Sequence, residues 1–149
     1  MPQVKKVLYP LELSPLSPAV APWVEAVAQQ WSAELHVLHV VPGLEFWGMA
    51  YASEALVAND LPLLVEKARP LVEEFCVVNF RSHRPAVVAV ASGGPAHEII
   101  GYASQNAIDL IVMGTHSQAG LDRALFGSVA DKVLRSTTVP VLIVPPGRS

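Results

Sequence analysis

The chain has little charge, a single cysteine and no long hydrophobic run. Of its 149 residues, 15% are charged. The lone Cys76 excludes an internal disulfide, and its apolar neighbours favour a structural thiol in a reducing compartment. A signal-peptide core is missing because Pro10, Glu12 and Pro15 interrupt the first apolar segment, and no stretch approaches the roughly 20 apolar residues of a membrane helix. These absences predict a cytoplasmic protein without a membrane partner.

Basic residues are also few. Ten Lys and Arg residues face 13 Asp and Glu residues, which gives a net charge of −3, and the basic residues are scattered along the chain. Nucleic-acid binding needs clustered positive charge, so a nucleic-acid partner is excluded. Hydrophobic residues make up 52% of the chain. Such a content predicts either a homo-oligomer or a densely buried parallel sheet.

The histidines do not form a metal site in the sequence pattern. His36 and His39 are three residues apart on a predicted strand, so their side chains should point to opposite faces of the sheet. His83, His97 and His116 have no acidic or cysteine partner at metal-ligand spacing. We therefore predict no metal site within the protein.

Short apolar runs alternate with helical patterns along the whole chain. The predicted strands cover 4–9, 35–41, 86–91, 110–113 and 139–144. Helices are predicted to begin at Ser17, near Asp60, after Pro95 and at Ser128, with Ser17 and Ser128 acting as caps. Strands that are apolar on both faces and alternate with helices are typical of a parallel sheet covered on both sides. We expect one α/β domain spanning residues 1–149.

Two details of the predicted helices depend on individual residues. In the first helix, Trp23 and Trp31 share the apolar stripe, so both should face the core. In the second, expected from about Asp60 to Phe75, Leu71 belongs to the apolar stripe and Pro70 predicts a kink or a break.

The segment from Asp109 to Val144 is the most informative for function. It consists of a buried apolar run ending at Gly114, a loop of small and polar residues, a helix that opens at Gly127 and Ser128, and a second apolar run. Glycines let the backbone approach a ligand closely, and the N-terminus of a helix attracts anions. This arrangement is typical of a phosphate-binding loop, although the Walker A spacing is absent.

This segment resembles the universal stress protein family. The ATP-binding branch of that family carries the motif G-x2-G-x9-G-[ST] before its last helix. Gly114 matches the first glycine, and Gly127 with Ser128 matches the closing pair, whereas Ser117 stands at the second glycine. The resemblance covers nearly the whole chain. It implies an open, Rossmann-like sheet of five parallel strands, related to the adenine nucleotide α-hydrolases, with strand order 3-2-1-4-5.

Ligands of such sheets bind beyond the carboxyl ends of the strands, where the strand order reverses. Two segments should line that crevice: Pro10, Leu11 and Glu12 after the first strand, and Met113 with Gly114 after the fourth. The resemblance places Glu12 where the family has a nucleoside-contacting Asp, and it implies ATP, which Mg²⁺ could accompany. It further implies adenine contacts from the backbone of Val40 and phosphate contacts from Gly127, Ser128 and Val129. His116 and Ser117 belong to the same loop.

Each of these residues also has a structural explanation. Glu12 could be a solvated charge, Gly127 a turn glycine and Ser128 a simple helix cap. Ser117 would cost roughly 1–2 kcal/mol if the site needs a left-handed backbone there. Two functions therefore stay open: a nucleotide-binding stress-response module, or a dimeric interaction protein with a vestigial site. An enzyme of the hydrolase type lacks a catalytic constellation, so we expect slow ATP hydrolysis or none.

The last predicted strand should lie at an edge of the sheet. A bare apolar edge strand promotes association unless it is covered, and family members commonly pair this strand across a two-fold axis. We therefore expect a homodimer formed through Val141, Leu142, Ile143 and Val144, together with an unidentified protein partner. The aromatic segment from Phe46 to Tyr51 could pack on the core, cover the crevice or meet that partner.

Overall fold

A computed structural model describes residues 1–43, 54–115 and 127–145 of the chain. Five parallel strands form one sheet in the order β3-β2-β1-β4-β5. The strands are β1 (Lys6–Pro10), β2 (Glu34–Pro42), β3 (Val87–Gly93), β4 (Leu110–Gly114) and β5 (Val141–Val144). The predicted fold class and strand order are confirmed, and β5 lies at an edge as expected.

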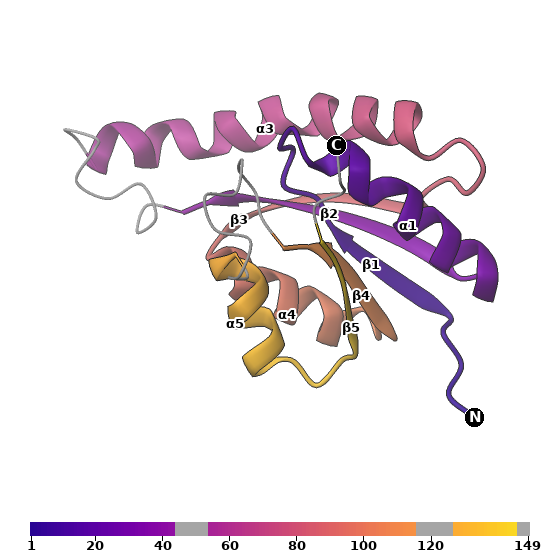
Figure 1. The fold of residues 1–149 in the computed structure, drawn as a ribbon. Helices are drawn as coiled ribbons and strands as arrows, with labels where there is room; N and C mark the ends of the chain where they lie inside the picture. Colours follow the sequence, from indigo (N-terminus) through magenta and orange to yellow (C-terminus); the bar gives the residue numbers. More distant parts are fainter. Residues whose placement is uncertain (44–53, 116–126, 146–149) are drawn as a thin grey trace.

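In the described residues, four helices connect the strands and cover both faces of the sheet (Figure 1). They are α1 (Ser17–Trp31), α3 (Glu54–Asn79), α4 (Pro95–Gln105) and α5 (Ser128–Ser136). Helices α1 and α3 lie on one face, and α4 and α5 lie on the other. This three-layer arrangement follows from strands that are hydrophobic on both sides.

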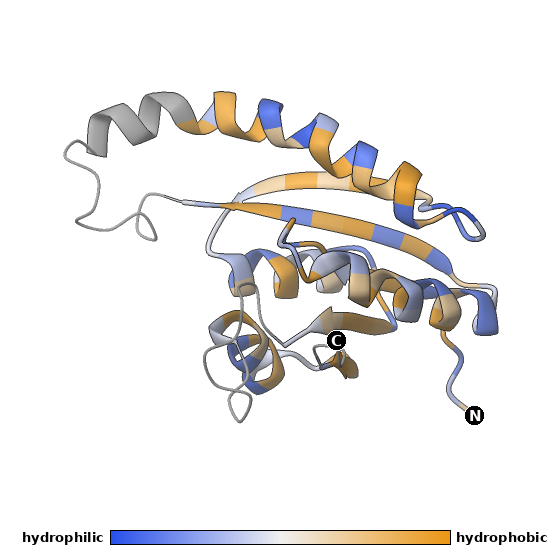
Figure 2. Cartoon of the chain, turned by 45° about the horizontal axis from the view of Figure 1, so that its top comes forward, coloured by the Kyte–Doolittle hydropathy of each residue, from blue (hydrophilic) through white to orange (hydrophobic). Residues whose placement is uncertain are grey.

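Each face of the sheet has its own hydrophobic core. On the first face, Val24 and Val72 of the helices pack with Leu35 and Val37 of β2. On the second, Ile99 and Val133 pack with Leu38 and other strand residues. Side chains alternate between the two cores along β2 because successive residues of a strand point to opposite faces. Figure 2 shows this hydrophobic character along the strands, interrupted on β2 by hydrophilic positions.

Helix α3 departs from the prediction in length and continuity. It begins at Glu54 and passes through Pro70 as one helix. A proline removes one backbone donor, but Ala68 and Val72 on either side are buried against the sheet. That packing outweighs the local defect, so the predicted break at Pro70 is wrong.

Three of the predicted core residues are exposed instead. Trp23 is 59% exposed and Leu71 is 56% exposed. Trp31 is also exposed. In α1 the inner face is narrower than the apolar stripe, and small residues such as Ala21 and Ala28 form its buried contact.

The two predicted serine caps are also wrong. Leu16 is the N-cap of α1 and Gly127 is the N-cap of α5, and neither helix start has a side-chain cap hydrogen bond. Ser17 and Ser128 are instead the first helical residues. A serine one position too late cannot receive the first-turn N–H groups as a cap does.

Two other predictions concern Cys76 and the membrane. Cys76 is buried, and burial raises the pKa of its thiol to about 11, which fits a structural role. Within 1–43, 54–115 and 127–145, no helix is both long and apolar enough to cross a membrane.

Candidate functional site

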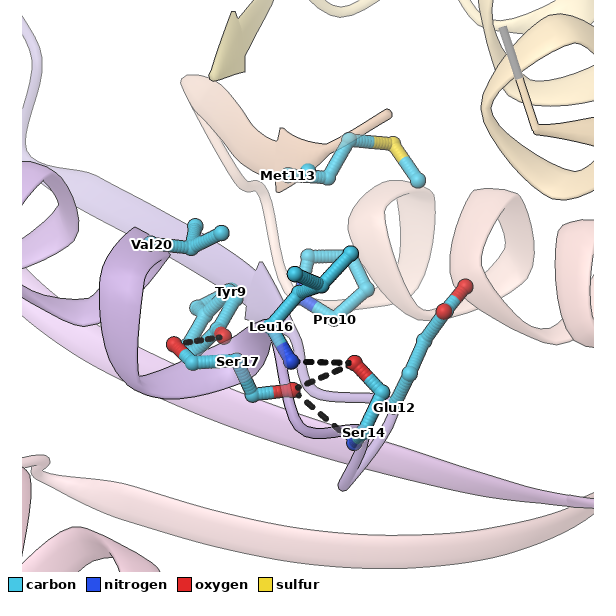
Figure 3. Close-up of a pocket in the computed structure, with 9 residues that line it drawn as sticks. Tyr9, Pro10, Glu12, Ser14, Leu16, Ser17, Val20 and Met113 are labelled. Carbon is cyan, nitrogen blue, oxygen red and sulfur yellow. Dashed lines mark hydrogen bonds between the residues drawn. The ribbon is translucent and has the colours of Figure 1, made fainter. Parts of the chain in front are cut away.

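A small hollow, open to solvent, lies beyond the carboxyl ends of β1 and β4. These two strands are neighbours at the centre of the sheet, and the chain connects outward from them in opposite directions. This is the switch point at which open parallel sheets bind their ligands. Residues of the turn between β1 and α1 line one side, and residues at the end of β4 line the other (Figure 3).

Serine hydrogen bonds hold the turn between β1 and α1 in shape. The Ser14 N–H donates to Ser17 Oγ at 3.1 Å, and the Leu16 N–H donates to Ser14 Oγ at 3.2 Å. Leu13 in this turn adopts φ of 60°, in the left-handed region that non-glycine residues rarely enter. The turn is therefore held in a strained conformation beside the hollow, as is common at functional sites.

Tyr9 forms the buried floor next to this turn. Its hydroxyl donates to the Ser17 carbonyl at 3.4 Å. Burial raises the pKa of the phenol far above its usual value, and the nearby Glu12 carboxylate raises it further. Tyr9 thus remains protonated and supports the turn.

Gly114 brings β4 close to α1. A Cβ atom built on Gly114 would lie 3.1 Å from Cγ2 of Val20. Gly114, Val20 and Met113 all line the hollow, with Met113 across from the serines in Figure 3. The absence of a side chain at Gly114 thus serves both helix packing and access to the hollow.

The N-terminus of α5 comes next to the end of β4. The Gly127 N–H donates a short hydrogen bond to the carbonyl of Thr115, the residue after β4. Ser128 is exposed, and no side chain caps the helix. The first turn of α5 therefore presents N–H groups and positive potential beside the hollow.

Among the described residues, the Thr115 hydroxyl has no hydrogen-bond partner. Thr115 is 8% exposed, and its Oγ1 is the one buried side-chain polar atom without a partner in the described part of the chain. An unsatisfied buried hydroxyl costs about 1–3 kcal/mol. Such a group in a native protein calls for a specific explanation.

The structure brings some of the predicted site residues together. Pro10, Glu12, Met113 and Gly114 all line the hollow. Leu11 does not: its side chain lies in the core, its N–H donates to the Leu38 carbonyl at 2.8 Å, and its carbonyl accepts from His39 Nδ1 at 2.6 Å.

Val40 and the α5 residues lie outside the lining of the hollow. The last residue of β1, Pro10, pairs with Leu38, so Val40 extends two positions past the end of its neighbouring strand. Gly127, Ser128 and Val129 form the start of α5, and the Gly127 amide is engaged by Thr115. His116, Ser117 and the segment from Phe46 to Tyr51 lie outside the described residues.

Several lining residues were not predicted. They are Tyr9, Ser14, Leu16, Ser17 and Val20. They lie at the end of β1, in the turn that follows it and in the first residues of α1. The predicted position of the crevice beside that turn was the available indication. Thr115 was also missed, because its isolation depends on the tertiary environment.

His39 connects β2 to the turn that carries Glu12. Since the Leu11 carbonyl only accepts, Nδ1 must carry the proton in this contact. Burial lowers the pKa of His39, which favours the neutral ring. His36 contacts Glu34 and Tyr102 instead, and the described residues contain no group of three or more potential metal ligands.

Comparisons with known proteins agree with this fold. The model of the universal stress protein family matches residues 3–145. The chain is 33% identical over 145 residues to universal stress protein MJ0531 of Methanocaldococcus jannaschii, covering 94% of this chain and 81% of that protein. The solved structure of MJ0577, from the same organism, superposes with a TM-score of 0.77 at 28% identity, covering 99% of this chain and all of that one.

A more distant solved structure contains a nucleotide. It is a universal stress protein in complex with cAMP, with a TM-score of 0.69 and 17% identity, and the match covers 98% of this chain and 100% of that chain. At this identity the similarity shows a shared fold.

Proposed function

Because this chain belongs to the universal stress protein family, we propose that it binds ATP at the hollow between β1 and β4 and acts as a regulatory stress-response module. One observation carries the proposal: the hollow lies at the switch point of the sheet, beside the uncapped first turn of α5. An anionic ligand with an apolar portion suits both features. The cAMP complex of a structural neighbour supports an adenine nucleotide.

Several of the predicted residues have a role in this proposal. Glu12 accepts hydrogen bonds from the ribose hydroxyls, while Pro10 and Met113 contact the apolar part of the nucleoside. Val40, which extends past the end of β1, offers its backbone to adenine. Phosphates bind at the first turn of α5, where Ser128 and Val129 supply N–H groups. The amide of Gly127 has a structural role, since it closes the loop onto Thr115.

Two residues favour the alternative function, an interaction protein with a vestigial site. Ser117 replaces a motif glycine, and Glu12 is one methylene longer than the family's Asp. The double variant Ser117→Gly with Glu12→Asp should bind ATP about tenfold more tightly. Unchanged affinity would contradict a site weakened by these two residues.

The proposed role of ATP is regulatory. We expect hydrolysis well below one turnover per second, the lower end of ordinary enzyme rates. A steady-state phosphate-release assay measures this directly, and turnover at or above that rate would contradict the proposal. Mg²⁺ could accompany the nucleotide.

The first experiment is to identify any nucleotide that the protein retains. Purified protein is denatured, and the supernatant is analysed by nucleotide chromatography and mass spectrometry. Near-stoichiometric ATP or ADP would support the proposed function. If the extract is empty, calorimetric titration with MgATP decides between a weak exchangeable site and the vestigial alternative.

We also propose that the chain forms a homodimer through β5. This strand is at the edge of the sheet, and its Leu142 is 38% exposed. Val141, Ile143 and Val144 continue the apolar strand, so pairing with a second copy would cover it. A regulatory module acts on another protein. Affinity capture with the ATP-bound dimer would identify that partner.

A charge at the proposed interface tests the dimer. Leu142→Lys should convert the dimer to a monomer in light scattering, because a lysine on an edge strand opposes strand pairing. Leu134→Lys is a matched control, since Leu134 on α5 is equally exposed at 38%. An unchanged dimer in Leu142→Lys would refute this interface.

A further inference from the structure

The outward face of α3 carries hydrophobic residues that the fold leaves exposed. The inward face of this helix packs on the sheet through residues such as Val72 and Cys76. On the opposite side, Leu63, Leu71 and Val78 are 47%, 56% and 55% exposed. They are spaced by eight and seven residues, which is about two helical turns, so they share one face. Several exposed hydrophobic side chains on one face indicate an interaction surface, whereas a single one would be ordinary.

Two charged residues lie between these hydrophobic positions. Lys67 follows Leu63 by one turn, and Glu74 precedes Val78 by one turn, and both are exposed. Among the described residues, neither Lys67 nor Glu74 forms an ion pair. Hydrophobic and hydrophilic positions alternate along α3 in Figure 2. We call this set the α3 stripe; in chain order it consists of Leu63, Lys67, Leu71, Glu74 and Val78.

The α3 stripe is complementary to itself when its direction is reversed. Its midpoint is the bond between residues 70 and 71. Lys67 and Glu74 lie at equal distances on either side of this midpoint, and so do Leu63 and Val78. A helix rises by a constant amount per residue. A second α3, running antiparallel about a two-fold axis through the midpoint, therefore places its Glu74 opposite Lys67 and its Val78 opposite Leu63. The symmetry forms each of these pairs twice.

We infer that the α3 stripe is a contact surface for a second copy of this chain, paired antiparallel with its own α3. The hydrophobic residues provide the buried area, and the charges fix the direction, because parallel helices in register would set lysine against lysine. This surface is separate from the proposed β5 contact, since α3 packs on β2 and β3 and β5 is at the other edge of the sheet (Figure 1). Two different two-fold contacts on one chain join dimers into larger assemblies. The inference does not depend on ATP binding.

Charge reversal on the α3 stripe tests this contact. Only one helix of each copy takes part, so α3 pairing should be weaker than the β5 dimer and appear at higher protein concentration. Sedimentation velocity over a concentration series at low ionic strength measures it. Lys67→Glu and Glu74→Lys each replace two attractive pairs by two repulsive ones and should each weaken the association on the order of tenfold. The first variant increases the net charge of −3 in magnitude and the second decreases it, so net charge cannot explain a loss in both.

Two further samples should restore the association. The double variant Lys67→Glu with Glu74→Lys regains opposite charges across the two-fold axis. An equimolar mixture of the two single variants sets an acidic stripe against a basic one, so it should associate as wild type does. Arg69→Glu is the matched control: it makes the same charge change as Lys67→Glu at an exposed position of α3 outside the stripe, and it should associate like wild type. Melting temperatures confirm that each variant is folded.

The outcomes separate this contact from the proposed β5 dimer. If the wild-type mass does not rise with concentration, or if the mixture stays as dissociated as its two components, the inference is wrong. Leu142→Lys should be a monomer when dilute and should still pair through α3 when concentrated, and adding Lys67→Glu should abolish that pairing. If Leu142→Lys leaves the dilute dimer intact while Lys67→Glu abolishes the association at high concentration, the β5 interface is wrong and the α3 contact stands.

Discussion

The two ends of the sheet differ in whether their buried polar groups have hydrogen-bond partners. At the amino end of β2, the buried ring of His36 has both nitrogens engaged: Nε2 with Glu34 Oε1 at 2.7 Å and Nδ1 with the Tyr102 hydroxyl at 2.7 Å. Because a carboxylate only accepts, Nε2 donates its proton to Glu34. At the carboxyl end, the Thr115 hydroxyl has no partner in the described residues.

Other contacts at the amino end follow the same pattern. The N–H groups of Lys5 and Lys6 donate to the Asp109 carboxylate at 2.9 and 3.0 Å. The N–H groups of Ser82 and His83 donate to Glu25 Oε2, each at 3.0 Å. Carboxylates thus bind backbone donors that no strand or helix satisfies.

We therefore expect residues at the amino end to determine stability and residues at the carboxyl end to determine ligand binding. The amino end is complete without a ligand, so its residues stabilise the fold. Among the described residues, the carboxyl end combines a hollow, an uncapped helix start and an unsatisfied hydroxyl, and we propose that the nucleotide binds there. Variants at the two ends should therefore affect different measurements.

The largest expected effect is at the amino end. His36→Ala should lower the free energy of unfolding by about 3 kcal/mol, because it opens a cavity and strands the Tyr102 hydroxyl. ATP affinity should not change. Urea denaturation and calorimetry measure the two quantities, and Tyr102→Phe, which keeps the ring, should cost only about 1 kcal/mol. A clear loss of ATP affinity in His36→Ala would show that the two ends are coupled.

Gly114→Ala should act at the carboxyl end. Its new methyl would approach Val20 Cγ2 to 3.1 Å, and the branched side chain of valine has little rotamer freedom in a helix. Helix α1 must move away, which should cost about 1–2 kcal/mol of unfolding free energy and weaken ATP binding as well. Wild-type stability together with wild-type affinity would contradict a close contact between Gly114 and Val20.

Gly101→Ala is compared with Gly114→Ala, because Gly101 lies away from both ends of the sheet. Apart from its chain neighbours and the nearby backbone of its own helix, no heavy atom lies within 4 Å of a Cβ built on Gly101 in α4. Alanine favours a helix over glycine, so the variant should gain about 0.5–1 kcal/mol of stability with unchanged ATP affinity. A loss of stability in urea denaturation would contradict the expectation that a methyl group fits at Gly101.

The smallest expected effect is a pH dependence from His39, whose pKa is lowered from 6.5 in the folded protein. The unfolded chain therefore binds more protons between the folded pKa and 6.5, so unfolding free energy falls as the pH drops through 6.5 and levels off below the folded pKa. His39→Asn keeps a donor for the Leu11 carbonyl and lacks this titration. Its stability should fall less than that of wild type from about pH 7.5 to about pH 5.5. His97→Asn, at an exposed position, should retain the wild-type slope.

Much of the fold was predictable because it depends on local patterns. Apolar runs such as 110–113 identified strands, and their two-sided hydrophobicity indicated a parallel sheet. The predicted crevice followed from that topology, and Pro10, Glu12, Met113 and Gly114 do line the hollow. Predictions that depended on packing were less successful: α3 continues through Pro70, and Trp23 is exposed.

The sequence by itself determined the order of strands and helices, the parallel sheet and the end of that sheet at which a ligand would bind. These properties follow from the period of the hydrophobic pattern and from the position of glycines and prolines within a few residues of each other. Only the tertiary structure decided that the Gly127 amide closes onto Thr115 and that His36 is satisfied on both sides. It also decided that the Thr115 hydroxyl has no hydrogen-bond partner within residues 1–43, 54–115 and 127–145. Hydrogen-bond partners and burial depend on which distant segments meet, and that information is absent from any local stretch of the chain.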